Sequence, residues 1–368
     1  MVAGTAQFTL QHWIMIAIGC VMMWLGVAKN LEPLLLVPIG FGAVLVNVPG
    51  TGLMEGHGFL KALYDAGIIT ELFPILIFIG IGAMTDFGPL LENPRILLFG
   101  AAGQFGIFLT LLLALGLGFT QLEALAIGII GACDGPTAIY VTTNYAPHLL
   151  GSVSVAAYSY MALVPILQPP IMRALTTDAE RQIVMPTVKR SVSKTTKLVF
   201  PIMVTGFTAV VAPLGTPLMG MLMLGNLFRE VGGLDRLAKT ASNELGNIVT
   251  LLLGLTIGAT MQADQFLNIK TLGIFALGLI AISLDTVMGV LFGKLMCFLT
   301  GGKVNPLIGA AGISALPMAA RVVQNEGQRY NKKNHLLMHA MGANTGGQVG
   351  SIMAAAIMLS IVNALGIH

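Results

Sequence analysis

The sequence predicts an all-α, polytopic membrane protein with an elevator-like transporter architecture: two inverted repeats, about ten transmembrane helices and two re-entrant broken hairpins. Three observations support this prediction: the composition, a duplicated interrupted segment, and the distribution of basic residues. Hydrophobic residues make up 55% of the 368 residues and charged residues only 10%, whereas soluble proteins average about 25% charged residues. This composition excludes an ordinary soluble domain.

The interrupted segment at 127–139 reads Ile-Gly-Ile-Ile-Gly-Ala-Cys-Asp-Gly-Pro-Thr-Ala-Ile and is apolar except for Asp134. An ionisable residue in such a run is costly to keep in lipid and by default marks an ion or proton site. Gly131, Gly135 and Pro136 would interrupt a helix, which is tolerated at membrane depth only where the backbone is buried or lines a cavity. We therefore predict a broken segment that holds a cation at Asp134, in preference to a purely structural carboxylate.

The same frame returns 181 residues later at 308–319, so that both stretches read Ile-Gly-x-x-Gly-x-x-x-x-Pro-x-Ala. The alignment places Ser314 opposite Cys133, and Gly309 and Gly312 supply the breaks of the second copy, which carries no charge. Interrupted segments at corresponding places in two halves of a chain indicate the binding site of a transporter.

Twelve apolar segments follow one another along the chain, six in each half. Those of the first half lie near 10–28, 33–48, 68–84, 97–118, 122–140 and 151–172. Those of the second half lie near 198–212, 217–228, 247–262, 271–296, 305–320 and 335–362. We predict a first repeat at 1–175, a cytoplasmic basic loop at 176–197 and a second repeat at 198–368. The run at 13–27 lacks a basic leader and a cleavage site, so we expect a retained span there and not a signal peptide.

The basic residues decide between two topologies. If all twelve segments cross the membrane, the 19 Lys and Arg residues divide twelve to seven. If 122–140 and 305–320 are re-entrant hairpins, seventeen fall inside, among them Lys189 and Arg190, and only Lys61 and Lys270 fall outside. Because cytoplasmic loops carry the excess of basic residues, the second topology is favoured. Each repeat then crosses five times, so the repeats are inverted and the two hairpin tips can meet near the midplane.

Other polar residues have two interpretations each. Asn344 lies in a glycine-rich part of the last segment, where its amide oxygen suits sodium or bridges two helices. Asp285 is a second ion or proton site or a structural partner. Tyr158 and Tyr160 fit core packing with one hydrogen bond each. Arg321 binds a carboxylate-bearing substrate or only enforces the topology. No phosphate loop, nucleophile elbow or nucleic-acid patch is visible in the sequence.

Nine stretches resemble the beta subunit of the biotin-dependent, sodium-pumping decarboxylases, the family that acts on oxaloacetate, glutaconyl-CoA, methylmalonyl-CoA or malonate. The resemblance covers the chain from about residue 70 to its end. The stretches are 131–139, 146–151, 155–165, 168–172, 174–177, 225–230, 305–312, 316–321 and 337–342.

The resemblance implies a multi-pass subunit of the bacterial cytoplasmic (inner) membrane that decarboxylates carboxybiotin, drives Na⁺ outward and consumes a proton from outside. The implied partners are a biotinyl carrier subunit or domain, a carboxyltransferase alpha subunit, a small gamma/delta-type membrane subunit and further copies of this chain in a homo-oligomer. By similarity, the catalytic residues are Asp134, Tyr160 and Arg321. The sodium ligands are Asp134, Asn305, Ser314 and Asn344.

We expect sodium and a proton to exclude each other at Asp134, because either one neutralises a carboxylate in a medium of low dielectric constant. A proton from outside would then discharge sodium and later reach carboxybiotin. The chief alternative is a stand-alone sodium-coupled secondary transporter, either a carboxylate symporter or a cation/proton antiporter. A purely structural membrane anchor is disfavoured, since it needs no buried aspartate between duplicated helix breakers.

Overall fold

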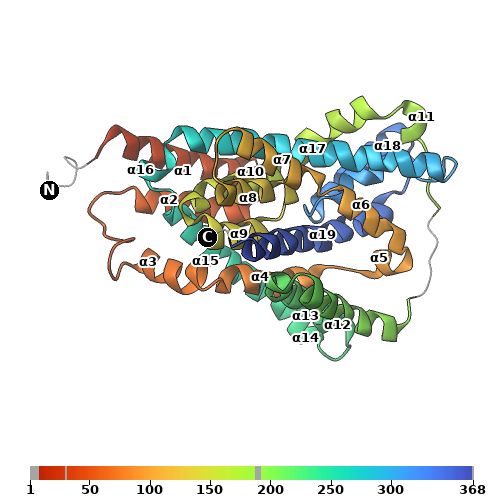
Figure 1. Ribbon diagram of the computed structural model, residues 1–368, viewed down its shortest axis with the longest axis horizontal. Helices are drawn as coiled ribbons and strands as arrows, with labels where there is room; N and C mark the ends of the chain where they lie inside the picture. Colours follow the sequence, from red (N-terminus) through yellow and green to blue (C-terminus); the bar gives the residue numbers. More distant parts are fainter. Residues whose placement is uncertain (1–7, 30, 187–191, 367–368) are drawn as a thin grey trace.

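The computed structural model describes residues 8–29, 31–186 and 192–366, and within these ranges it contains helices and no strands (Figure 1). The predicted all-α class is thus confirmed. Lys189 and Arg190 lie outside the described residues. Six helices are long and apolar enough to cross a membrane, and a seventh candidate is bent by 63° at residues 70–71. The six are Leu10–Ala28, Pro94–Gly116, Pro147–Leu175, Lys194–Val211, Ile269–Leu299 and Leu337–Ala364.

The first half of the chain contains ten α-helices. They are α1 (Leu10–Ala28), α2 (Pro33–Val46), α3 (Phe59–Tyr64), α4 (Leu72–Met84), α5 (Gly88–Glu92), α6 (Leu97–Ala102), α7 (Phe105–Gly116), α8 (Gln121–Gly128), α9 (Gly135–Tyr145) and α10 (Leu150–Leu175). A 3-10 helix, η4 (Ile129–Ala132), extends α8 up to the break before α9.

The described part of the second half contains nine α-helices. Its α-helices are α11 (Asp178–Arg181), α12 (Lys194–Val211), α13 (Thr216–Glu230), α14 (Asp235–Thr240), α15 (Gly246–Ala259), α16 (Ala263–Phe266), α17 (Ile269–Leu299), α18 (Met318–Tyr330) and α19 (Leu337–Ala364). A 3-10 helix, η8 (Pro306–Gly312), stands where the first half has α8 and η4.

The 3-10 form of η8 follows from its sequence. Pro306, Gly309 and Gly312 are three residues apart, and residues at that spacing eclipse one another on one face of a 3-10 helix. This face packs on α17, where a methyl group added to Gly309 would lie 1.9 Å from Gly289 O and one added to Gly293 would lie 2.4 Å from Pro306 O. The small face therefore lets the two backbones approach closely.

The two halves pack across each other through glycines. Helix α2 packs against α15, and α4 packs against α13. A methyl group on Gly258 of α15 would lie 2.1 Å from Ile39 O of α2, and one on Gly82 of α4 would lie 1.9 Å from Leu222 O of α13. Small residues at helix contacts are the usual means by which membrane helices associate closely.

Gly258→Ala is expected to destabilise the protein by about 1–3 kcal/mol, because the added methyl group meets backbone atoms of α2 that cannot turn away. The change is measured as a lower melting temperature of the purified protein in detergent. Gly206→Ala in α12 is the matched control, since nothing lies within 4 Å of a methyl group there. Its melting temperature should stay the same or rise, because alanine is the better helix former, and an equal loss at both sites would contradict the prediction.

Helix α19 runs through the middle of the molecule (Figure 1) and contacts α6, α9, α18 and η8. It therefore touches both interrupted segments, the one at 122–140 through α9 and the one at 305–320 through η8. Figure 1 shows α1 and α16 at one end of the elongated molecule and α11 and α18 at the other. The polar residues of α19 are placed between the breaks by this packing.

Candidate functional site

The two breaks in the chain touch each other. The Ser314 N–H donates a hydrogen bond to the Ala132 carbonyl at 3.2 Å, so the backbones of the two halves are joined at these points. Cys133, between η4 and α9, has a φ angle of 52°, a left-handed conformation that non-glycine residues seldom adopt. Cys133 and Ser314 are both buried. The break at 133–134 is thus a sharp, enclosed turn.

Asp134 follows this turn and caps the N-terminus of α9. Its carboxylate is only 4% exposed and accepts hydrogen bonds from the Thr137 hydroxyl (2.6 Å), Gln348 Nε2 (2.9 Å) and the Ser351 hydroxyl (3.0 Å). A helix N-terminus also favours negative charge. The three donors and the helix N-terminus together arrange the carboxylate as a buried, oriented acceptor.

Thr137, Gln348 and Ser351 were not singled out as site residues from the sequence. The signal that could have found two of them is periodicity: Asn344, Gln348 and Ser351 are spaced four and three apart in an apolar segment. That spacing places them on one face of a helix. The face is directed at the breaks, since Gln348 and Ser351 bind Asp134 and Asn344 binds the second interrupted segment.

Asn344 and Ser314 hold the second break against α19. The Asn344 amide donates to the Ile313 carbonyl at 2.6 Å, and the Ser314 hydroxyl donates to the Gly347 carbonyl at 2.9 Å. Among the described residues, Asn344 Oδ1 is buried and has no hydrogen-bond partner. This oxygen is therefore available to a ligand.

A cavity of about 270 Å³ opens between the breaks. Its polar lining consists of Asp134, Ser314, Gln348 and Thr85, and the rest is mostly apolar. Carboxylate, hydroxyl and amide oxygens are hard ligands of the kind that bind small cations without directional demands. The lining residues are Ile81, Met84, Thr85, Cys133, Asp134, Gly135, Pro136, Met161, Ser314, Leu316, Pro317, Met341 and Gln348.

The structure does not bring the other predicted site residues to this cavity. Asn305 begins η8: its amide donates to the Arg181 and Ile183 carbonyls and its oxygen accepts from the Leu307 N–H. The Tyr160 hydroxyl donates to the Phe275 carbonyl in α17. None of these residues lines the cavity.

Arg321 lies in the first turn of α18, four residues after Pro317, which lines the cavity. Its side chain is exposed, and it makes no ion pair within the described ranges. Arg321 does not itself line the cavity. An exposed guanidinium without an ion pair can bind an anion without first breaking another contact.

Tyr158 is 1% exposed, and within the described part of the chain its hydroxyl has no hydrogen-bond partner. The ring packs on Gly135: a methyl group there would lie 2.1 Å from a ring carbon and 2.6 Å from the hydroxyl oxygen. Glycine at 135, the residue after Asp134, is therefore required for this tyrosine to reach the break.

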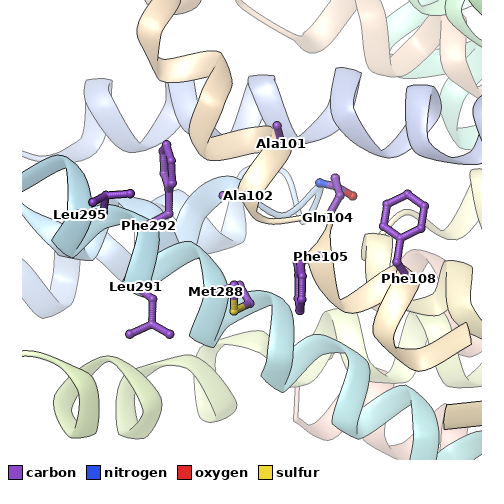
Figure 2. A pocket seen from close by; sticks show the side chains of 9 residues that line it. All are labelled: Ala101, Ala102, Gln104, Phe105, Phe108, Met288, Leu291, Phe292 and Leu295. Carbon is purple, nitrogen blue, oxygen red and sulfur yellow. The ribbon is translucent and has the colours of Figure 1, made fainter. Parts of the chain in front are cut away.

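Gln104 connects further parts of the site. Figure 2 shows it at the bend between α6 and α7, beside an apolar groove of about 390 Å³ against α17. Its Nε2 donates to the Gly100 carbonyl (3.2 Å), the Gly312 carbonyl (3.2 Å) and the Gly347 carbonyl (3.3 Å). One amide thus joins α6, the second break and α19.

Comparison with known proteins shows to which family this chain belongs. A sequence profile described as Na⁺-transporting oxaloacetate decarboxylase beta subunit matches residues 11–362. Methylmalonyl-CoA decarboxylase subunit beta of Veillonella parvula is 54% identical over 98% of this chain and 96% of the relative. Glutaconyl-CoA decarboxylase subunit beta of Acidaminococcus fermentans is 52% identical over 98% and 96%. The oxaloacetate decarboxylase beta chain of Klebsiella pneumoniae is 46% identical over 96% and 95%. The chain belongs to the family of Na⁺-transporting oxaloacetate decarboxylase beta subunits.

Proposed function

We propose that this chain is the membrane beta subunit of a sodium-translocating, biotin-dependent decarboxylase. It decarboxylates carboxybiotin and couples this reaction to outward Na⁺ transport, with consumption of a proton. The observation that carries the proposal is the buried Asp134 carboxylate at the contact between two broken segments, in a chain of this family. A stand-alone sodium-coupled transporter is disfavoured, because relatives across almost the whole chain are decarboxylase subunits.

The architecture proposed for this function is a pair of inverted repeats, 1–175 and 198–368, joined by a cytoplasmic loop at 176–197, with about ten membrane-crossing helices in all. The segments at 122–140 and 305–320 are re-entrant hairpins that enter from opposite sides. Two contacts support the pairing of repeats: Gly258 against α2, and Gly82 against α13. Each joins the third segment of one half to the second segment of the other half, as related repeats would. An elevator-like movement of the hairpins against this scaffold would expose the cavity alternately.

In this proposal the Asp134 carboxylate, the Ser314 hydroxyl and Asn344 Oδ1 bind sodium as cargo. Ser314 lines the same cavity as Asp134. Asn344 Oδ1, in the neighbouring helix α19, is one of the buried oxygens without a hydrogen-bond partner in the described part of the chain, although Asn344 does not itself line the cavity. Asn305 as a sodium ligand stays a prediction that these contacts do not support, since its oxygen is occupied by the Leu307 N–H. Gly131, Gly309 and Gly312 allow other backbone segments to approach the two breaks closely, and Gly135 makes room for the Tyr158 ring.

Coupling takes place at Asp134. Without a cation, a buried carboxylate is stabilised by a proton; with sodium bound, the proton leaves. The hydrogen bonds from Thr137, Gln348 and Ser351 keep the same oxygen oriented in both states.

The reaction takes place at the mouth of the cavity, where Arg321 binds the carboxylate of carboxybiotin. The bond between the biotin nitrogen and the carboxyl carbon breaks, CO₂ leaves, and the proton consumed ends on that nitrogen. Tyr160 is proposed to take part in delivering this proton, although its hydroxyl is bound to the Phe275 carbonyl in this state.

The partners proposed are a biotinyl carrier, a carboxyltransferase alpha subunit and a small gamma/delta-type membrane subunit, in a homo-oligomeric arrangement in the bacterial inner membrane. The names of the relatives support this, because each is one subunit or chain of a decarboxylase. The substrates named differ between these relatives, so the acyl substrate is proposed to be selected by another subunit.

The test is reconstitution of the purified chain in liposomes with a carboxylated biotinyl carrier and radioactive sodium. We expect carboxybiotin decarboxylation that rises with sodium concentration, and sodium movement that stops when carboxybiotin is left out. Uncarboxylated carrier is the control for the added protein. Sodium uptake that runs equally well without carboxybiotin would instead indicate the stand-alone transporter.

A further inference from the structure

Asp285, in the middle of α17, is a buried carboxylate that the proposed sodium site does not use. Its side chain is 0% exposed. One oxygen, Oδ1, accepts a hydrogen bond from the Gly106 N–H at the start of α7. Among the described residues, the other oxygen, Oδ2, is buried and has no hydrogen-bond partner. Half of the acceptor capacity of this carboxylate is thus unused in an apolar interior.

The carboxylate occupies a slot between two glycines. A methyl group added to Gly106 would lie 2.5 Å from Oδ1, and one added to Gly131 would lie 2.9 Å from Oδ2. Gly131 is two residues before Cys133, at the break in the first half. The unpaired oxygen therefore lies against the backbone of the same break that presents Asp134 three residues further on.

The position of Asp285 is not accidental within the repeat. The 181 residues that separate Cys133 from Ser314 also separate Gln104 from Asp285, and Gly131 from Gly312. Gln104 binds the carbonyl of Gly312, and Asp285 lies against Gly131. In each half, one polar side chain thus lies against the break of the other half. The Gln104 amide donates hydrogen bonds there, whereas the Asp285 carboxylate can donate one only when it is protonated.

Within the described ranges, neither carboxylate at this break has a basic partner. The titratable groups around the break are Asp134, Cys133, Asp285 and Tyr158, whose ring packs on Gly135, and no lysine, arginine or histidine of those ranges forms an ion pair with either aspartate. A buried charge without a counter-charge is costly even after relaxation, so a charge-neutralising ligand is needed at Asp285 as well as at Asp134.

We propose that Asp285 Oδ2, against Gly131 at the first break, is a second binding point for a monovalent cation, Na⁺ or a proton, beside Asp134. The inference rests on the proposed function for its role in transport, but the site itself is a property of the fold. Cations at Asp134 and Asp285 then neutralise two carboxylates of one turn, and the occupancy of Asp285 follows the movement of the Gly131 backbone.

The test uses the purified full-length chain with Asp134→Asn, which removes the first carboxylate, beside the double variant Asp134→Asn/Asp285→Asn. Two quantities are measured: equilibrium binding of radioactive sodium, and the infrared C=O band of a protonated carboxylic acid as pH or sodium is changed. If sodium occupies the site, binding survives in the single variant and disappears in the double variant. If a proton occupies it, a pH-dependent acid band is present in the single variant and absent in the double variant. Either result supports the proposal and names the ligand.

The proposal is overturned if the two variants bind equal sodium and show the same spectra, because Asp285 is then inert. Asparagine keeps an acceptor for the Gly106 N–H, so both variants should remain folded. The control for folding is Ser283→Ala, at a half-buried position of α17 whose hydroxyl donates to the Leu279 carbonyl of the same helix. A similar melting temperature in all variants shows that lost binding is not lost structure. Neither measurement requires turnover, so both can be interpreted even if the proposed decarboxylase function is wrong.

Discussion

Asp134→Asn is expected to lower sodium-dependent carboxybiotin decarboxylation by roughly a hundred-fold or more. Removing one charge from a buried ion pair costs about 3 kcal/mol or more, and about 1.36 kcal/mol corresponds to a factor of ten. The amide is nearly the same size as the carboxylate and can still accept from Thr137, Gln348 and Ser351, so the site should keep its shape. What it loses is the negative charge that balances sodium and the ability to take up a proton.

The measurement is decarboxylation rate against sodium concentration for the reconstituted complex, with the wild type alongside. Asp178→Asn is the matched control, because the Asp178 side chain is 76% exposed and its ion pair with Arg181 lies within α11. Solvent screens a carboxylate that is this exposed, so this variant should behave like the wild type. Normal sodium-dependent turnover in Asp134→Asn would refute the assignment of coupling to this carboxylate.

Arg321→Gln is expected to lower kcat/KM for carboxybiotin about thirty-fold or more. Its exposed guanidinium is the nearest described arginine in sequence to the cavity-lining Leu316 and Pro317, and a hydrogen bond to a charged group contributes about 1.5–3 kcal/mol. Arg321→Lys should recover only part of the loss, because an ammonium group keeps the charge but not the paired donors that match a carboxylate.

Arg329→Gln is the control for this prediction. Arg329 is exposed in the last turn of the same helix, eight residues further along the chain. Its substitution removes the same charge at a position further from Pro317. A steady-state titration with carboxylated carrier separates KM from kcat in each variant. If Arg321→Gln and Arg329→Gln reduce activity equally, the effect is general surface electrostatics and not substrate binding.

Much of the site could be predicted because a charged residue and helix breakers stand out within a single apolar segment. A carboxylate between glycine and proline in an apolar run is unusual enough to identify Asp134, and the repeated frame identifies Ser314 as the residue that corresponds to its neighbour Cys133. The structure brings the two breaks into contact through the Ser314 N–H and the Ala132 carbonyl. The prediction that the tips meet is therefore supported by a contact that no spacing rule specifies.

The polar partners of Asp134 could not be chosen in the same way. Gln348 and Ser351 are more than 200 residues away in sequence, and their side chains are equally suited to helix contacts. Asn305 shows the opposite case: it has a suitable oxygen and lies in the right segment, but folding directs it to the loop carbonyls of Arg181 and Ile183. Residue type and spacing constrain which ligands exist, whereas packing determines which of them converge.

The sequence by itself determined the all-α membrane class, the two interrupted segments and the central carboxylate, because hydropathy, helix breakers and intramembrane charge act within a few residues of each other. Only the tertiary structure decided that α19 passes between the breaks, that Gln348 and Ser351 bind Asp134, and that Asp285 lies against Gly131 of the same break. These contacts depend on close approach at residues such as Gly106, Gly131 and Gly258. A glycine permits another backbone segment to approach closely, but only the fold determines which segment does so.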